Sequence, residues 1–151
     1  MDAVTYPKEE VSNFINKNVI PLRVPSDQQP ISTDFKVNWT PALLILDQEG
    51  NEHYRTIGFM GAEELIPSIW LGIGNSHFDG NNFEEALSCY EKLLADYSRS
   101  DSAPEAIFQK GVSLYKSTND PKPLKEAYEQ LQDKYPTSKW AERAYPYRLI
   151  Q

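Results

Sequence analysis

The chain has 151 residues, of which 40% are apolar and 25% are charged, and its 22 acidic and 15 basic side chains give a net charge of −7. This composition is typical of a folded globular protein of one ordinary domain or two small ones, and the acidity argues against binding nucleic acid or an anionic membrane, because both depend on clustered Lys and Arg. The longest apolar runs, such as 42–46, are far shorter than the roughly 20 residues that cross a bilayer, and no signal peptide is visible, so we expect a cytoplasmic protein without membrane insertion.

The first 61 residues predict alternating helix and strand. Pro7 followed by two acids is a helix start, since proline is tolerated in the first turn and acids favour the positive end. The turn residues Asp47–Asn51 separate two apolar runs and predict a hairpin. The expected elements are a helix with Val11, Phe14 and Ile15 on one face, a strand Val19–Val24, a short helix Ile31–Phe35, a strand Ala42–Leu46 and a returning strand His53–Gly58.

Two features of the strands bear on the sheet. Pro21 lacks a backbone donor, so the strand Val19–Val24 must place it at an edge or a gap in the ladder. The strand Ala42–Leu46 is apolar at every position, which is typical of a strand covered on both faces by helices.

The remaining residues are helical and repeat themselves. The expected helices are Ala62–Phe78, Phe83–Tyr97, Ser102–Lys116, Lys122–Tyr135 and a fifth beginning with Trp140–Ala144. At an offset of 38 residues, Tyr90 corresponds to Tyr128 and Leu93 to Leu131. An internal period of this size is typical of a helical repeat protein.

The residues of this repeat resemble the tetratricopeptide repeat family. The spacing of Trp70, Gly74, Phe83, Ala86, Tyr90 and Leu93 carries the resemblance, and the run from Tyr135 to Ala144 is similar to the repeat junctions of bacterial members. The resemblance covers residues 67–147, about two and a half repeats. It implies protein–protein interaction, because such arrays present a concave face to a peptide or helix.

The first part resembles a different family. The run Val37–Glu52, which reads V-N-W-T-P-A-L-L-I-L-D-x-x-G-x-E, followed by Gly58 and Phe59, is similar to the C-terminal half of a thioredoxin-like domain. The resemblance implies a cis peptide bond at Thr40–Pro41. Met1–Val11 is similar to the segment that follows the CxxC helix in one subgroup, yet the CxxC motif itself has no counterpart here. Two explanations stay open: a reading frame taken from an internal Met, or a genuine fragment without a redox centre.

Candidate site residues follow from these resemblances. A cis-proline loop would present Trp39, Thr40 and Pro41 to an extended peptide, whereas a trans bond would be an ordinary turn entering a strand. The aromatic residues of the helices could line a peptide groove, although their helical spacing favours core packing. That set is Trp70, Phe78, Phe83, Tyr90, Phe108, Tyr115 and Tyr128.

No other chemistry is indicated. Cys89 lies in mid-helix and is expected to be a packed small hydrophobe rather than a reactive thiol. His53 and His77 have no carboxylate or cysteine at ligand spacing, so we expect no zinc site. We therefore predict no catalytic residues, no cofactor and no metal.

The sequence thus predicts an α/β part joined to an all-α part: an incomplete thioredoxin-like sheet over 1–61 and a tetratricopeptide-like array over 62–151, with helix 62–78 shared. The expected function is a protein-interaction scaffold that binds a protein or peptide. The alternative is a truncated thiol-disulfide oxidoreductase whose CxxC lies upstream of Met1.

The resemblance also implies that a strand is missing between Val19–Val24 and Ala42–Leu46. The two strands could pair directly in parallel, or a strand of another molecule could fill the place. We expect a weakened three-stranded sheet that forms a homodimer through its unpaired edges.

Overall fold

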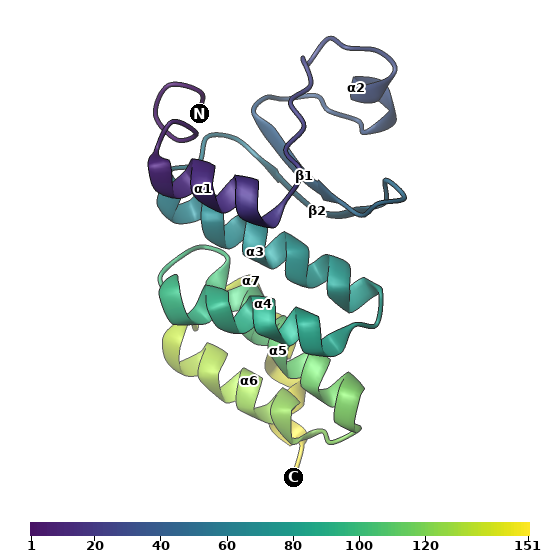
Figure 1. Cartoon of the computed structure of the whole chain (residues 1–151). Helices are drawn as coiled ribbons and strands as arrows, with labels where there is room; N and C mark the ends of the chain where they lie inside the picture. The colour runs from purple at the N-terminus through teal and green to yellow at the C-terminus, as the bar shows by residue number, and fades with distance from the viewer.

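A long helix, α3 (Ala62–Asp79), runs through the middle of the molecule, with a β-hairpin and helix α1 on one side and the remaining helices on the other (Figure 1). The computed structural model describes residues 1–151. In chain order its other elements are α1 (Glu9–Asn18), α2 (Ile31–Asp34), β1 (Ala42–Leu46), β2 (Glu52–Ile57), α4 (Phe83–Asp96), α5 (Ala103–Thr118), α6 (Lys122–Lys134), α7 (Lys139–Ala144) and a 3-10 helix, η1 (Tyr145–Leu149). None of the helices has both the length and the apolar character needed to cross a membrane.

The helical half consists of two helix pairs and the start of a third. Helices α3 and α4 form the first pair, α5 and α6 the second, and α7 packs against both members of the second pair together with η1. Each pair turns over three residues, and Asn81 and Asn119 adopt the left-handed conformation there (φ 61° and 59°), which Asn tolerates better than most residues. The five predicted helices are confirmed to within about two residues at each end.

The repeat predicted at an offset of 38 residues is confirmed by burial. Ala86, Cys89 and Leu93 of α4 are buried, and so are their counterparts on α6, Leu124, Ala127 and Leu131.

The two tyrosines at this offset were expected to be equivalent, and this is only partly so. Tyr90 is fully buried, whereas Tyr128 is half-buried and meets the ring of Tyr145 edge-on. The difference arises because α5 covers Tyr90 with a full helix, while the short α7 and η1 follow Tyr128.

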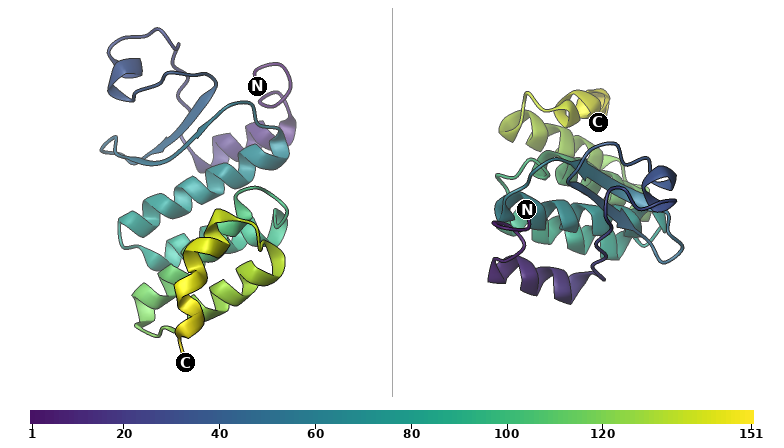
Figure 2. Two further views of the ribbon diagram at one scale, coloured as in Figure 1. Left: turned by 180° about the vertical axis from the view of Figure 1, so that it is seen from behind. Right: turned by 90° about the horizontal axis from the view of Figure 1, so that it is seen from above.

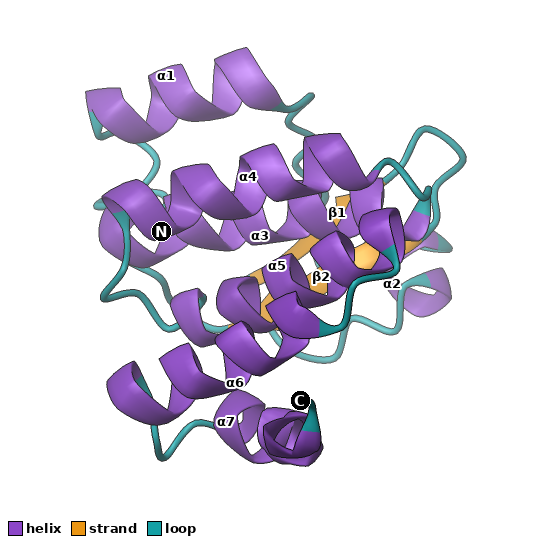
Figure 3. Cartoon of the chain, turned by 90° about the horizontal axis from the view of Figure 1, so that it is seen from below, coloured by secondary structure: helices purple, strands orange, loops and turns teal.

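The hairpin is an antiparallel pair that lies on α3. Ala42 is opposite Ile57 and Ile45 is opposite Tyr54. The Asp47 carboxylate organises the turn by accepting bonds from the backbone N–H groups of Glu49 (3.0 Å) and Asn51 (2.8 Å). The two strands are the only regular elements that are not helical (Figure 3), so the predicted hairpin is confirmed.

The predicted three-stranded sheet is wrong, because the sheet has only the strands β1 and β2. Residues 20–24 leave α1 as an irregular segment that makes no backbone hydrogen bond, and Ile20 and Leu22 are 97% and 83% exposed. The segment does not pair in parallel with β1. A strand requires a partner, and here none of this chain's backbone reaches it.

Strand β1 is also less covered than predicted. None of its residues is fully buried, and Leu46 is 38% exposed. Leu43 and Ile45 pack toward α3, but no layer of helices buries the opposite face of the strand.

Helix α1 packs on α3 through the apolar face that the sequence predicted for it. Val11 is fully buried against α3, and the ring of Phe14 meets Trp70 edge-on at 5.2 Å between centroids. The Thr40–Pro41 peptide bond is cis, as the resemblance implied; the Gln29–Pro30 bond is also cis, which the sequence did not indicate.

The closest approach of the two halves lies at Gly72 of α3. A Cβ atom at this position would overlap the side chain of Ile45 and lie 3.0 Å from the Cβ of Tyr54. We expect Gly72→Ala to destabilise the protein by about 1–3 kcal/mol, the usual cost of an extra methyl group in a packed core. Gly80→Ala is the matched control, because its Cβ would meet nothing closer than 3.4 Å and its φ of −77° suits any residue. Urea denaturation that found equal effects for the two substitutions would contradict this packing.

Tyr90 is expected to be the most sensitive position of the array. Its ring is fully buried and its hydroxyl donates to Asn75 Oδ1 at 2.9 Å. Tyr90→Ala should cost ~3–5 kcal/mol, and Tyr90→Phe about 1–2 kcal/mol through the lost hydrogen bond. Glu84→Gln, on the exposed face of the same helix, should change thermal stability little. Equally small effects at Tyr90 and Glu84 in thermal melts would refute the assigned repeat.

Candidate functional site

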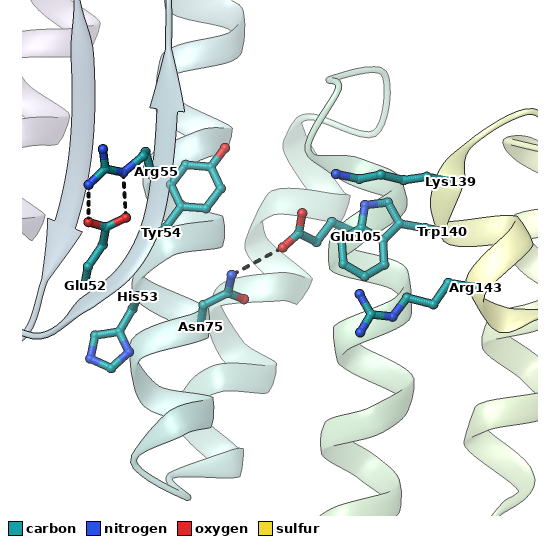
Figure 4. A pocket seen from close by; sticks show the side chains of 9 residues that line it. All are labelled: Glu52, His53, Tyr54, Arg55, Asn75, Glu105, Lys139, Trp140 and Arg143. Carbon is teal, nitrogen blue, oxygen red and sulfur yellow. Dashed lines mark hydrogen bonds and ion pairs between the residues drawn. The ribbon is translucent and has the colours of Figure 1, made fainter. Parts of the chain in front are cut away.

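A polar groove lies between the hairpin and the first helix of each pair. The cavity has a volume of about 520 Å³ and is bounded by β2, α3, α5 and α7 (Figure 4). Helices α4 and α6 face the viewer in Figure 1, whereas α7 is in front when the molecule is seen from behind (Figure 2, left). The lining residues are Glu52, His53, Tyr54, Arg55, Asn75, Glu105, Lys139, Trp140 and Arg143.

Helix α7 supplies the positive side of this groove. The Ser138 side chain caps the helix by accepting from Ala141 N–H at 3.1 Å. Lys139 and Arg143 are four residues apart and therefore lie on one face. Both are exposed, and neither has a carboxylate within 4.0 Å. Both cations lie 5.4 Å from the centroid of the half-buried Trp140 ring between them, at cation–π distance.

Glu105 projects into the groove from the first turn of α5. Burial raises the pKa of its carboxyl group, while the hydrogen bond from Asn75 and the nearby charges of Lys139 and Arg143 act in the opposite direction. Asn75 Nδ2 lies 3.4 Å from Glu105 Oε1. The carboxylate is thus held at the base of the groove without a direct ion pair.

Strand β2 forms the opposite wall, where the charges neutralise each other. Arg55 binds Glu52 with two hydrogen bonds of 2.7 and 2.6 Å, and this interaction lowers the pKa of Glu52. Arg55 also donates to the backbone carbonyl groups of Phe35 and Lys36, which ties the segment after α2 to the hairpin. The free positive charge of the groove therefore lies on α7.

An apolar hollow of about 460 Å³ adjoins the polar groove. Trp140 and Arg143 line both the groove and the hollow. The guanidinium of Arg143 lies beside both the Trp140 and Phe108 rings, 5.4 and 5.6 Å from their centroids, and the two rings contact each other at 5.1 Å between centroids. The other residues of the hollow are Phe78, Gln109, Val112, Pro146 and Tyr147. A polar and an apolar site thus adjoin.

At the other end of the groove, His53 links the hairpin to the end of α3. Its Nε2 lies 2.9 Å from Asp47 Oδ2 and its Nδ1 lies 2.6 Å from Asp79 Oδ2, with only 11% of the side chain exposed. Two carboxylates can both accept only from a protonated imidazole, and the bonds to Asp47 and Asp79 raise the pKa of His53. The same contact lowers the pKa of Asp47.

The sequence-predicted loop residues lie outside this groove. Trp39, Thr40 and Pro41 precede β1, and Trp39 is 74% exposed. Cys89 is 6% exposed and burial raises the pKa of its thiol, so the prediction of a packed cysteine is confirmed. Of the predicted aromatic set, Tyr90 lies in the core, while Phe78 and Phe108 line the hollow.

Sequence reasoning missed the cations of α7 and the partners of His53. The spacing of Lys139 and Arg143 was a local signal for a shared face. Asp79, in contrast, is 26 residues from His53, and no local pattern connects them.

Comparison with known protein families supports the helical part. Residues 69–100 and 105–138 match the model of the tetratricopeptide repeat family, which confirms the predicted repeats at both helix pairs. No curated protein matches the chain. The thioredoxin-like resemblance of the first part finds no support in these comparisons.

The paired carboxylates make the stability of the hairpin depend on pH. A raised His53 pKa means that the stabilisation is fully present below the ordinary value of 6.5 and is lost as the pH rises through the raised value. The lowered Asp47 pKa means that the stabilisation contributed by its carboxylate is present above pH 3.8, the ordinary pKa, and is lost in acid. We expect the melting temperature to fall as the pH rises above neutrality. His53→Gln should remove most of this fall, whereas His77→Gln should leave it in place. A wild-type melting temperature that stays constant or increases over this range would contradict the interaction.

Proposed function

We propose that the protein is an interaction module whose groove binds an extended segment of another protein and holds a carboxylate of that segment at the cations of α7, Lys139 and Arg143. The match to the tetratricopeptide repeat supports protein–protein binding in general, because such arrays offer a concave face to their partners. The more specific part of the proposal is that the bound segment carries a carboxylate.

One observation supports a carboxylate in the ligand. Two exposed cations without ion-pair partners lie on one face of α7, in a chain of net charge −7. A carboxylate that reaches the ammonium of Lys139 or the guanidinium of Arg143 would accept charge-assisted hydrogen bonds, which are about twice as strong as neutral ones. The Glu105 carboxylate at the base of the groove repels an anion, so the bound carboxylate must stay on the α7 side of the groove.

The adjoining hollow adds a second requirement for the ligand. Its walls are mainly aromatic and aliphatic, with Phe108 and Val112 from α5 and Tyr147 from η1. An apolar side chain next to the carboxylate could be buried there while the charge stays with Arg143. The preferred segment is therefore an acidic group, on a side chain or at a chain end, beside a large apolar residue.

The loop before β1 is a second candidate contact for the same kind of ligand. Trp39, Ile57 and Phe59 are 74%, 52% and 64% exposed, and the strand register places them at one end of the hairpin. Exposed aromatic side chains that gather at one place are typical of interaction sites. We propose that Trp39, Thr40 and Pro41 contact peptide there.

The alternative of a thiol-disulfide oxidoreductase gains nothing from these residues. Cys89 is the one cysteine of the chain, and its thiol is buried with a raised pKa. A reactive cysteine needs the opposite surroundings, namely exposure and a lowered pKa.

The test uses two arrays of random short peptides, identical except that one has free C-terminal carboxylates and the other has amidated ends. We expect enrichment of free carboxylates or internal acids beside apolar residues. For a selected peptide, Arg143→Gln or Lys139→Gln should weaken binding at least about tenfold, equivalent to 1.4 kcal/mol. Lys125→Gln, on α6 outside the groove, is the matched control and should change the affinity less than about twofold.

The outcome that would refute the proposal is selected peptides, in both arrays, that carry no carboxylate at a side chain or chain end, or selected peptides that bind Arg143→Gln as tightly as the wild type. Trp39→Ala separates the two candidate contacts. If it abolishes binding while Arg143→Gln does not, the loop before β1 is the site and the groove is not.

A further inference from the structure

One edge of strand β1 carries backbone groups that have no partner in the chain. Pro41 O accepts from Gly58 N–H at 2.8 Å, so the residues opposite each other at this position form a hydrogen-bonded pair. Hydrogen-bonded and non-bonded pairs alternate along an antiparallel ladder. Leu43 therefore bonds to β2, whereas Ala42 and Leu44 direct their N–H and C=O groups to the outer edge.

The residues along that edge are apolar. β1 is apolar at all five positions, and Ile45 and Leu43 pack against the cluster of α1 and α3. An exposed apolar strand edge without Pro or charge is a template for pairing with another strand.

The chain itself contains a segment that fits this edge. Residues 20–24 are as long as β1, make no backbone hydrogen bond, and expose Ile20 and Leu22 at 97% and 83%. Ile20, Leu22 and Val24 alternate, so in a strand they share one edge and one face. Pro21, which has no N–H group, falls on the other edge, where proline is tolerated when it faces solvent.

We propose that two copies of this chain associate through these elements, with residues 20–24 of each copy added as a strand to the free edge of β1 in the other. The arrangement is two-fold symmetric, because each copy supplies one segment and one edge. This inference goes beyond the groove and does not depend on the proposed function.

The buried area is that of a weak dimer. A five-residue strand is roughly 17 Å long in a sheet about 10 Å thick, so each added strand covers roughly 340 Å² counting both partners. Two such additions bury roughly 680 Å², the side chains of Ile20 and Leu22 included, which is below the roughly 1,000 Å² of a stable specific interface and in the range of weak, transient ones. We therefore expect a weak dimer, in the micromolar range or above.

The decisive measurement is residue-resolved amide exchange at concentrations from roughly 1 μM to 1 mM, alongside sedimentation equilibrium. As the dimer forms, the amides of Ala42 and Leu44 should become at least about tenfold more protected. The amides of Leu43 and Ile45 serve as the internal control, because β2 protects them at every concentration.

Leu22→Lys should raise the dimer dissociation constant at least about tenfold. Leu22 is 83% exposed, so this change should leave the monomer fold intact, which circular dichroism can verify. Leu149→Lys is the matched control, since Leu149 is 72% exposed at the other end of the chain. Added salt should strengthen the dimer, because two copies of charge −7 repel, whereas it should weaken a carboxylate bound to Arg143.

Three results would overturn the proposal: a monomer at all concentrations, protection of Ala42 and Leu44 that does not change with concentration, or equal weakening by Leu22→Lys and Leu149→Lys. None of these results bears on peptide binding in the groove, so the two proposals can fail separately.

Discussion

The fold depends on helix α3 being packed closely on two opposite sides. Gly72 and Gly74 are two residues apart and so point about 200° apart around the helix axis. A Cβ at Gly72 would overlap Ile45 of the hairpin, and one at Gly74 would overlap the ring of Tyr90 on α4. The missing side chains let both neighbours approach the helix backbone itself. α4 then positions α5, and α5 positions α6 and α7, so the shape of the groove follows from how closely α3 is packed.

A chain of buried hydrogen bonds connects the packed core around α3 to the groove. Tyr90 Oη donates to Asn75 Oδ1, and Asn75 Nδ2 faces the carboxylate of Glu105, which joins α4, α3 and α5. Buried polar groups must find partners, so Asn75 cannot turn away without leaving the Tyr90 hydroxyl unsatisfied. The same amide that satisfies the core thus determines where a negative charge sits at the base of the groove. Glu105 makes no direct ion pair with Lys139 or Arg143, so the charges of these two side chains remain available.

The elements that the sequence predicted correctly are those with local causes. The helices follow from apolar periodicity and from turn residues such as Asn119, and the hairpin follows from the turn at Asp47. Val19–Val24 failed because β-branched composition records only an ability to pair, while pairing itself needs a partner that composition does not supply. The groove could be predicted only in part. Lys139 and Arg143 share a helix face by their spacing, but Glu105 and His53 reach the groove through packing between distant segments.

The net charge of −7 contradicts an anionic ligand only if charge is treated as uniform over the surface. At physiological ionic strength, charges separated by more than about 8 Å are largely screened, so most of the acidic surface acts weakly on a bound segment. The cations of α7 act at contact distance, beside the low-dielectric rings of Trp140 and Phe108. In the proposed function, a carboxylate therefore gains its free energy from contacts with Lys139 and Arg143, and the net charge of the molecule has little influence on it. A uniformly basic surface would bind many acidic segments, whereas the proposed site, two cations beside an apolar hollow, would select those that also bring an apolar side chain.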